Sequence, residues 1–177
     1  MRGLLIGLKL FAAGVLQAVG PTGPWLGGVR LPLLLAVVLH YALTHGACAT
    51  TLAVAVVAGL IQDALSQTPL GLSSLVFGAA GLFVAQFRHD VFHSAALLHA
   101  WVGGLAVGGA TLAQWALLSA AGTIAIPGGS ALLRAVGSAA LGAVVTPAVC
   151  RVSDSLDRAL GAQAADRTHG GTRGGVR

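Results

Sequence analysis

An almost continuous apolar run, residues 31–62, constrains the fold of this chain more than any other feature. A single helix of that length would be about 48 Å long at ~1.5 Å per residue, whereas the hydrocarbon core of a bilayer is ~30 Å thick. The run must therefore break, and Thr44, His45 and Gly46 are the natural place. The sequence predicts a tight hairpin of two short helices, residues 31–43 and 47–62.

The composition of the whole chain is also strongly apolar. Hydrophobic residues make up 56% of the chain and charged residues only 8%, whereas a soluble domain carries about 25% charged residues. The net charge of +5 comes from basic residues at the ends of apolar segments and in the tail, which fits membrane topology and anionic lipid better than nucleic acid. Cys48 and Cys150 lack CxxC spacing, so both are expected to be buried thiols.

The expected fold is an all-α integral membrane protein, a bundle of six transmembrane helices within residues 1–152. The first segment is read as a retained helix, not a signal peptide, because Lys9 interrupts its apolar core. Residues 153–177 are expected to form a short cytoplasmic tail, amphipathic at first and then disordered. The six apolar segments are residues 4–19, 31–43, 47–62, 72–87, 94–121 and 131–150.

The distribution of basic residues supports six crossings with both termini in the cytoplasm. In that topology eight of the ten basic residues are cytoplasmic, and only Arg30 and Arg134 lie outside. Treating residues 31–62 as one span would instead export Arg88 and the whole basic tail.

The stretch of residues 59–72 contains the only acidic residue before Asp90, namely Asp63. A carboxylate at the rim of an apolar segment is costly unless it faces other protein or the aqueous boundary. Ser73 or Ser74 is expected to cap the helix that follows. Two interpretations stay open: a rigid re-entry turn in which Asp63 binds loose backbone donors, or a partner-binding site. The residues of this predicted turn are Gly59, Asp63 and Ser66, which share one helical face, followed by Pro69, which ends the helix, and Gly71, which permits an unusual backbone angle.

Small residues recur at four-residue intervals in the last two apolar segments, and such stripes let helix backbones approach closely. Packing within the bundle is the preferred interpretation, and a partner helix is the alternative. The two stripes are Ala100, Gly104 and Gly108 in one segment and Ser138, Gly142 and Thr146 in the other.

Metal binding and catalysis find little support in the sequence. His89 and His93 flank Asp90 at helical spacing, but a polar cluster at a cytoplasmic turn needs no metal. His40 and His99 are expected to be neutral and hydrogen-bonded to neighbouring helices. With no carboxylate pair and no phosphate loop, we expect no enzyme, no metal and no cofactor.

Three segments resemble the MreD family of bacterial rod shape-determining membrane proteins. They are Leu-Pro-Leu-Leu-Leu at 31–35, Gly-Leu-Ile-Gln-Asp-Ala-Leu-Ser at 59–66 and Pro-Leu-Gly-Leu-Ser at 69–73. The likeness covers roughly residues 31–92, and the family pattern matches here at the five turn residues named above.

The resemblance implies a non-enzymatic scaffold subunit of the cell-elongation complex in the bacterial cytoplasmic (inner) membrane. Such a protein packs against the membrane helix of MreC and helps connect MreB filaments with RodA and its partner penicillin-binding transpeptidase. The alternative function is a substrate-binding membrane subunit of a vitamin or metal transporter. In that case Asp63, Gln62, His99 or Gln114 would line a small-molecule pocket.

Overall fold

The fold is all-α, as the sequence predicts. The computed structural model describes residues 2–20, 31–66, 68–86, 96–122 and 128–159, and these ranges contain six helices. In chain order they are α1 (Arg2–Val19), α2 (Leu33–His45), α3 (Ala49–Ser66), α4 (Leu72–Gln86), α6 (Ala96–Ala120) and α7 (Gly128–Ala159).

Three of the described helices are long and apolar enough to cross a membrane, over Ala49–Ser66, His99–Ala120 and Gly128–Leu156. The other three, over Gly3–Val19, Leu33–His45 and Leu72–Gln86, are apolar but shorter. These helices are those of a membrane protein. The prediction of six complete crossings stays a prediction.

The break that the sequence predicts in the long apolar run is confirmed. Helix α2 ends at His45, and Gly46 follows with a φ of 74° while its N–H donates to the carbonyl of Ala42. The Thr51 hydroxyl donates to the carbonyl of Gly46 at 2.7 Å, which ties the start of α3 to the turn. A positive φ is easily adopted only by glycine, so Gly46 makes this sharp reversal possible.

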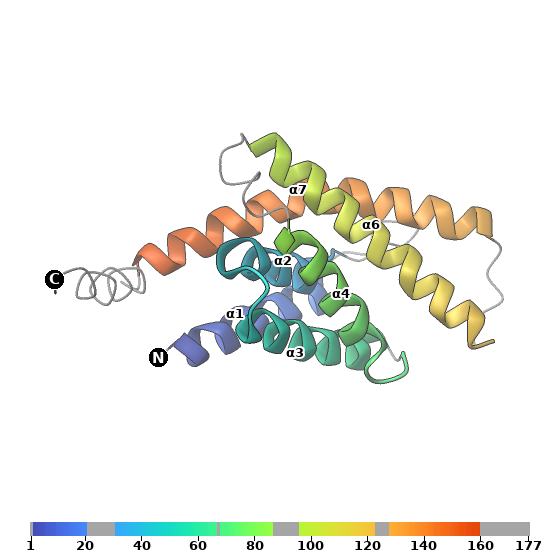
Figure 1. The fold of residues 1–177 in the computed structure, drawn as a ribbon, viewed down its shortest axis with the longest axis horizontal. Helices are drawn as coiled ribbons and strands as arrows, with labels where there is room; N and C mark the ends of the chain where they lie inside the picture. The colour runs from blue at the N-terminus through green and yellow to red at the C-terminus, as the bar shows by residue number, and fades with distance from the viewer. Residues whose placement is uncertain (1, 21–30, 67, 87–95, 123–127, 160–177) are drawn as a thin grey trace, which may run out of the picture.

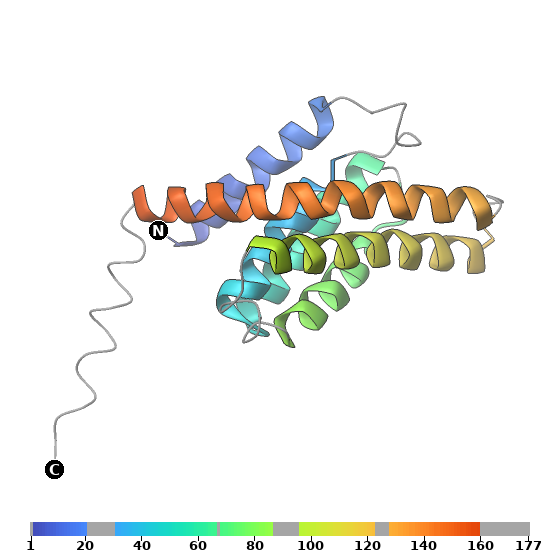
Figure 2. The same ribbon diagram turned by 90° about the horizontal axis from the view of Figure 1, so that it is seen from above.

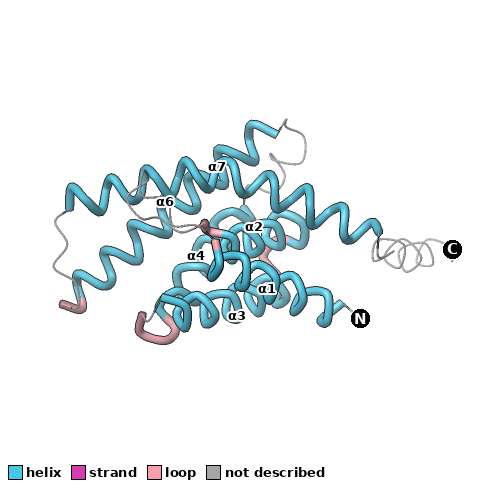
Figure 3. The backbone as a smooth tube through the Cα atoms, turned by 180° about the vertical axis from the view of Figure 1, so that it is seen from behind, coloured by secondary structure: helices cyan, strands magenta, loops and turns pink. Residues whose placement is uncertain are grey.

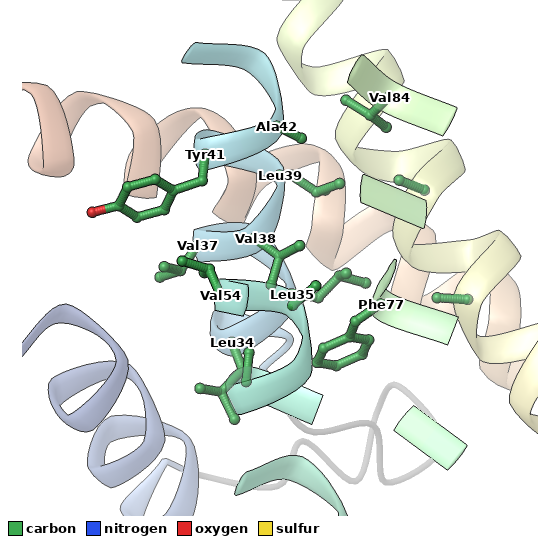
Figure 4. Close-up of a cluster of buried hydrophobic side chains, with 14 of the residues drawn as sticks. Leu34, Leu35, Val37, Val38, Leu39, Tyr41, Ala42, Val54, Phe77 and Val84 are labelled. Atoms are coloured by element: carbon green, nitrogen blue, oxygen red, sulfur yellow. The ribbon is translucent and has the colours of Figure 1, made fainter. Parts of the chain in front are cut away.

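Helix α2 is the core of the molecule, because every residue from Leu34 to Leu43 is buried. A helix that is apolar on all sides is stable only when other helices surround it. Figure 4 shows Phe77 and Val84 of α4 and Val54 of α3 pointing toward it. Helices α1 and α7 also contact α2, so the bundle is organised around the shortest of the described helices.

Helices α6 and α7 form a long antiparallel pair that lies along one side of the bundle and extends beyond its end (Figures 1 and 2). The start of α1 and the end of α7 lie at the same end of the molecule in both views. The opposite end carries the turn between α3 and α4, drawn in pink in Figure 3.

The predicted end of the last segment at Cys150 is wrong, because α7 continues without a break to Ala159. Hydrogen bonds from Ser155 Oγ to the carbonyl of Arg151 and from Arg158 Nε to the carbonyl of Asp154 follow the helix through this region. No helix-breaking residue stands at position 151, and Pro147 lies inside the helix instead of ending it. The division into residues 1–152 and 153–177 stays a prediction.

Candidate functional site: the Asp63 turn

The Asp63 carboxylate lies inside the protein, with only 1% of the residue exposed. Its Oδ2 atom accepts the N–H of Gly71 at 2.7 Å, and its Oδ1 atom accepts the Thr68 hydroxyl at 2.9 Å. The N–H of Ser73 points between the two oxygens, at 3.1 and 3.3 Å. A buried carboxylate needs several such donors to offset the loss of its hydration, and this turn supplies three groups.

These bonds make Asp63 the cap of the next helix. Gly71 and Ser73 flank the first residue of α4, where helical N–H groups have no partner within the helix. The negative charge also interacts favourably with the positive end of the helix dipole. The prediction that Ser73 or Ser74 caps α4 through its own side chain is therefore wrong, since a carboxylate from the preceding helix occupies that position.

Gly59 sets the distance between α3 and α4. A Cβ atom added at Gly59 would lie 2.3 Å from both the Cα and the backbone N of Ser74, which no real side chain tolerates. At this crossing Ser74 Oγ donates to the carbonyl of Val56 at 3.0 Å. Hydrogen bonding of this kind is one way in which helices associate inside a membrane.

The other predicted turn residues have different surroundings. Gly71 has a φ of 96°, so its backbone conformation favours glycine. Pro69 and Leu70 are exposed at the tip of the turn, Leu70 to 77%. Ser66 is not a hydrogen-bond partner of Asp63, although the sequence predicts that the two residues share a helical face. It is exposed and accepts a hydrogen bond from Gln62 Nε2 at 2.8 Å.

Amide side chains, of which that of Gln17 is buried, extend the polar region from the turn into the bundle. Gln17 of α1 donates to Gln62 of α3, and its own Oε1 accepts the N–H of Leu34, near the start of α2. On the other side, Gln114 of α6 donates to Ser73 Oγ at 3.0 Å. These bonds connect residues of five helices, α1, α2, α3, α4 and α6, and the sequence does not predict them. Amides isolated in apolar segments were the available signal.

The predicted small-residue stripes lie between α6 and α7. Cβ atoms added at Gly104 and Gly108 would come within 3.0 Å of the Ala139 carbonyl oxygen and 2.9 Å of the Ala139 Cβ, respectively. A Cβ at Gly142 would lie 2.6 Å from the Cβ of Val107. Ser138 Oγ lies 2.8 Å from Thr111 Oγ1 across the same contact. These four small residues of the two stripes therefore face the partner helix of the same chain.

The remaining candidates do not form a metal or catalytic centre in the described part of the chain. His89, Asp90 and His93 lie outside the described residues. Across the ranges given above, no three histidine, cysteine or acidic side chains are grouped as metal ligands would be. His40 is buried, and its Nδ1 lies 3.9 Å from Asp154 Oδ1 of α7, a pair that was not predicted.

The hydrogen bonds of Asp63 stabilise one backbone conformation of the turn. Both carboxylate oxygens are occupied by donors of the turn, which fixes the path of residues 68–73. The consequence is a rigid turn that presents Pro69 and Leu70 outward. Such a surface can meet lipid headgroups or another protein.

Comparison with known proteins identifies a family. The sequence profile of the family described as rod shape-determining protein MreD matches residues 3–122, which include the Asp63 turn, nearly all of α1, and helices α2, α3, α4 and α6. No curated protein and no solved structure matches the chain significantly.

Proposed function

This chain belongs to the MreD family of rod shape-determining proteins, and from that premise we propose that it is a non-enzymatic membrane scaffold of the bacterial cell-elongation complex. It binds an MreC-like protein and helps couple MreB filaments to RodA and a penicillin-binding transpeptidase. It lies in the cytoplasmic membrane with six spans and both termini inside the cell.

The observation that supports this proposal best is the way the Asp63 turn uses its polar groups. The Asp63 carboxylate holds the backbone of the turn, and among residues 68–71 the exposed ones are Pro69 and the apolar Leu70. A rigid apolar tip is a surface for contact, because exposed apolar groups on a fixed backbone bind a partner with little loss of conformational entropy.

The outer surface of the helices supports the same role. Large apolar side chains stand exposed on α1, α6 and α7, where lipid or another transmembrane helix can cover them. Association with a partner helix then depends on close packing and not on the hydrophobic effect, since lipid is equally apolar. Examples on three helices are Leu8, Leu105 and Leu133.

Co-purification with the partner tests the proposal. The chain is co-expressed with an MreC-like protein of the same bacterium, extracted in mild detergent and analysed by size-exclusion chromatography. We expect the two proteins to elute together. Separate elution of two folded proteins would remove the scaffold function.

A matched pair of variants tests the part played by the turn. Leu70→Arg places a charge on the exposed tip and is expected to reduce the co-eluting fraction several-fold. Ala121→Arg places the same charge on the exposed turn after α6 and is expected to leave it unchanged. Equal behaviour of the two variants would mean that the partner binds elsewhere.

A further inference from the structure

A partly open polar pocket of about 140 Å³ lies between the helices, beside the Asp63 turn. Each of the six described helices, or its end, contributes to the wall of this pocket. Two of the four residues considered for a transporter-like pocket, Gln62 and Gln114, line it, whereas Asp63 and His99 do not. The lining residues are Gln17, Pro32, Leu35, Gln62, Phe77, Val107, Ala110, Thr111, Gln114 and Ser138.

The three glutamines of the wall retain unused hydrogen-bonding capacity. Together their amides have six N–H donors, and only three of these are engaged, with Gln62 Oε1, Ser66 Oγ and Ser73 Oγ as acceptors. Among the described residues, the Oε1 atom of Gln114 accepts no hydrogen bond. The pocket therefore offers both free donors and a free acceptor to a molecule that enters it.

The rest of the wall limits what can bind. None of the lining side chains is charged, so neither an anion nor a cation would find a counter-ion there. Leu35, Phe77 and Val107 provide an apolar side. An apolar cavity of ~150 Å³ accommodates benzene, so this cavity has room for about five or six non-hydrogen atoms.

We propose that this cavity is a binding site for a small neutral molecule that carries a carboxamide and a short aliphatic group. A carboxamide presents an N–H donor to Gln114 Oε1 and a carbonyl acceptor to a free glutamine N–H. Its aliphatic part packs against the apolar side. This site does not depend on the scaffold function, because its wall does not include Pro69 or Leu70, the exposed tip that a partner would contact.

Ligand-observed NMR on the full chain in lipid nanodiscs tests this site, with propionamide as the probe. We expect saturable saturation-transfer signals from propionamide, at least ten-fold stronger than those of its charged analogues propionate and propylammonium. Empty nanodiscs measure partition into lipid. A signal that does not saturate, or equal signals from the three probes, would overturn the proposal and leave a cavity that holds water only.

Variants locate the binding. Gln114→Leu keeps much of the volume but removes the free acceptor, and is expected to weaken propionamide binding at least ten-fold. Ala110→Phe fills the cavity and is expected to abolish binding. Leu105→Phe, on the lipid-facing side of the same helix, is the control and should bind as the unmodified chain does. If Ala110→Phe does not fold, Gln114→Leu decides alone, and unchanged binding in it would overturn the proposal.

Discussion

At the scale of single residues, the Asp63 carboxylate explains how the turn between α3 and α4 keeps one shape. Three donors from three positions converge on its two oxygens, and two of them are backbone N–H groups that the start of α4 would otherwise leave unpaired. Burial strengthens these bonds because little water competes for them. The turn is thus held by one side chain.

Replacing Asp63 by Asn tests this explanation. The amide is neutral and has one acceptor oxygen instead of two, so at least one of the three donors, the N–H groups of Gly71 and Ser73 and the Thr68 hydroxyl, loses its acceptor and the remaining bonds weaken. We expect the free energy of unfolding to fall by about 1–3 kcal/mol, the cost of leaving a buried donor unpaired. Reversible unfolding in mixed detergent micelles measures it. Thr68→Val removes a single hydrogen bond to the same carboxylate, so it should lower the free energy of unfolding by less than Asp63→Asn does. An equal decrease in the two variants would contradict the role of Asp63 as the cap of α4.

Cys48 gives a second prediction at this scale, in the turn between α2 and α3. Hydrogen bonding from the Thr51 side chain, and then from its backbone, lowers the pKa of the Cys48 thiol below its usual 9.0. Removing the hydroxyl with Thr51→Val should raise this pKa, so alkylation of Cys48 becomes slower at pH 7.5 and its midpoint moves to higher pH. Thr51→Ser keeps the hydroxyl and should retain the original midpoint. Maleimide labelling rates across pH measure both.

The sequence singles out Asp63 from charge alone, because one carboxylate among apolar residues is costly. Its partners could not be predicted in the same way. Which N–H groups reach a side chain eight and ten residues away depends on the backbone path through Pro69 and Gly71, and local patterns favoured Ser73 and Ser74 as caps. Gln17 was missed because its role requires α1 and α3 to be neighbours.

At the scale of helices, glycines decide which pairs lie close together. Gly59 brings α3 against the backbone of α4, whereas Gly78 on α4 has no atom within 4 Å of the position a Cβ would take. The helix ends that depend on local chemistry were predictable, as at Gly46. The end of α7 was not, because a juxtamembrane arginine is compatible with either a helix end or its continuation.

Alanine substitutions at these two glycines give a matched test of helix packing. Gly59→Ala forces α3 and α4 apart and should destabilise the protein by about 1–3 kcal/mol, the usual cost of overpacking. Gly78→Ala should be neutral or slightly stabilising, because alanine favours the helix. Unfolding of both variants in mixed micelles measures the difference. Equal stabilities would show that the α3–α4 crossing does not limit the fold.

At the scale of the whole molecule, the helices run between two ends of different character. One end holds the start of α1, the turn at Gly46 and Cys48, and the end of α7, and the other holds the Asp63 turn. The sequence predicts this arrangement from hydrophobicity and from the placement of arginines, since both act on every segment. The central position of α2 could not be predicted, because six apolar segments look alike until they pack.

Cysteine labelling tests how these ends are placed relative to the membrane. If both termini are cytoplasmic, Cys48 faces the cytoplasm and Leu70 faces outward, because α3 carries the chain across between them. A membrane-impermeant maleimide should then label Leu70→Cys, in a Cys48→Ser background, in right-side-out vesicles. The unmodified chain should be labelled at Cys48 in inverted vesicles, with the buried Cys150 unreactive in both. The reverse pattern would place the Asp63 turn in the cytoplasm, where its exposed tip could meet only cytoplasmic partners, and the scaffold would have to contact MreC by its helices alone.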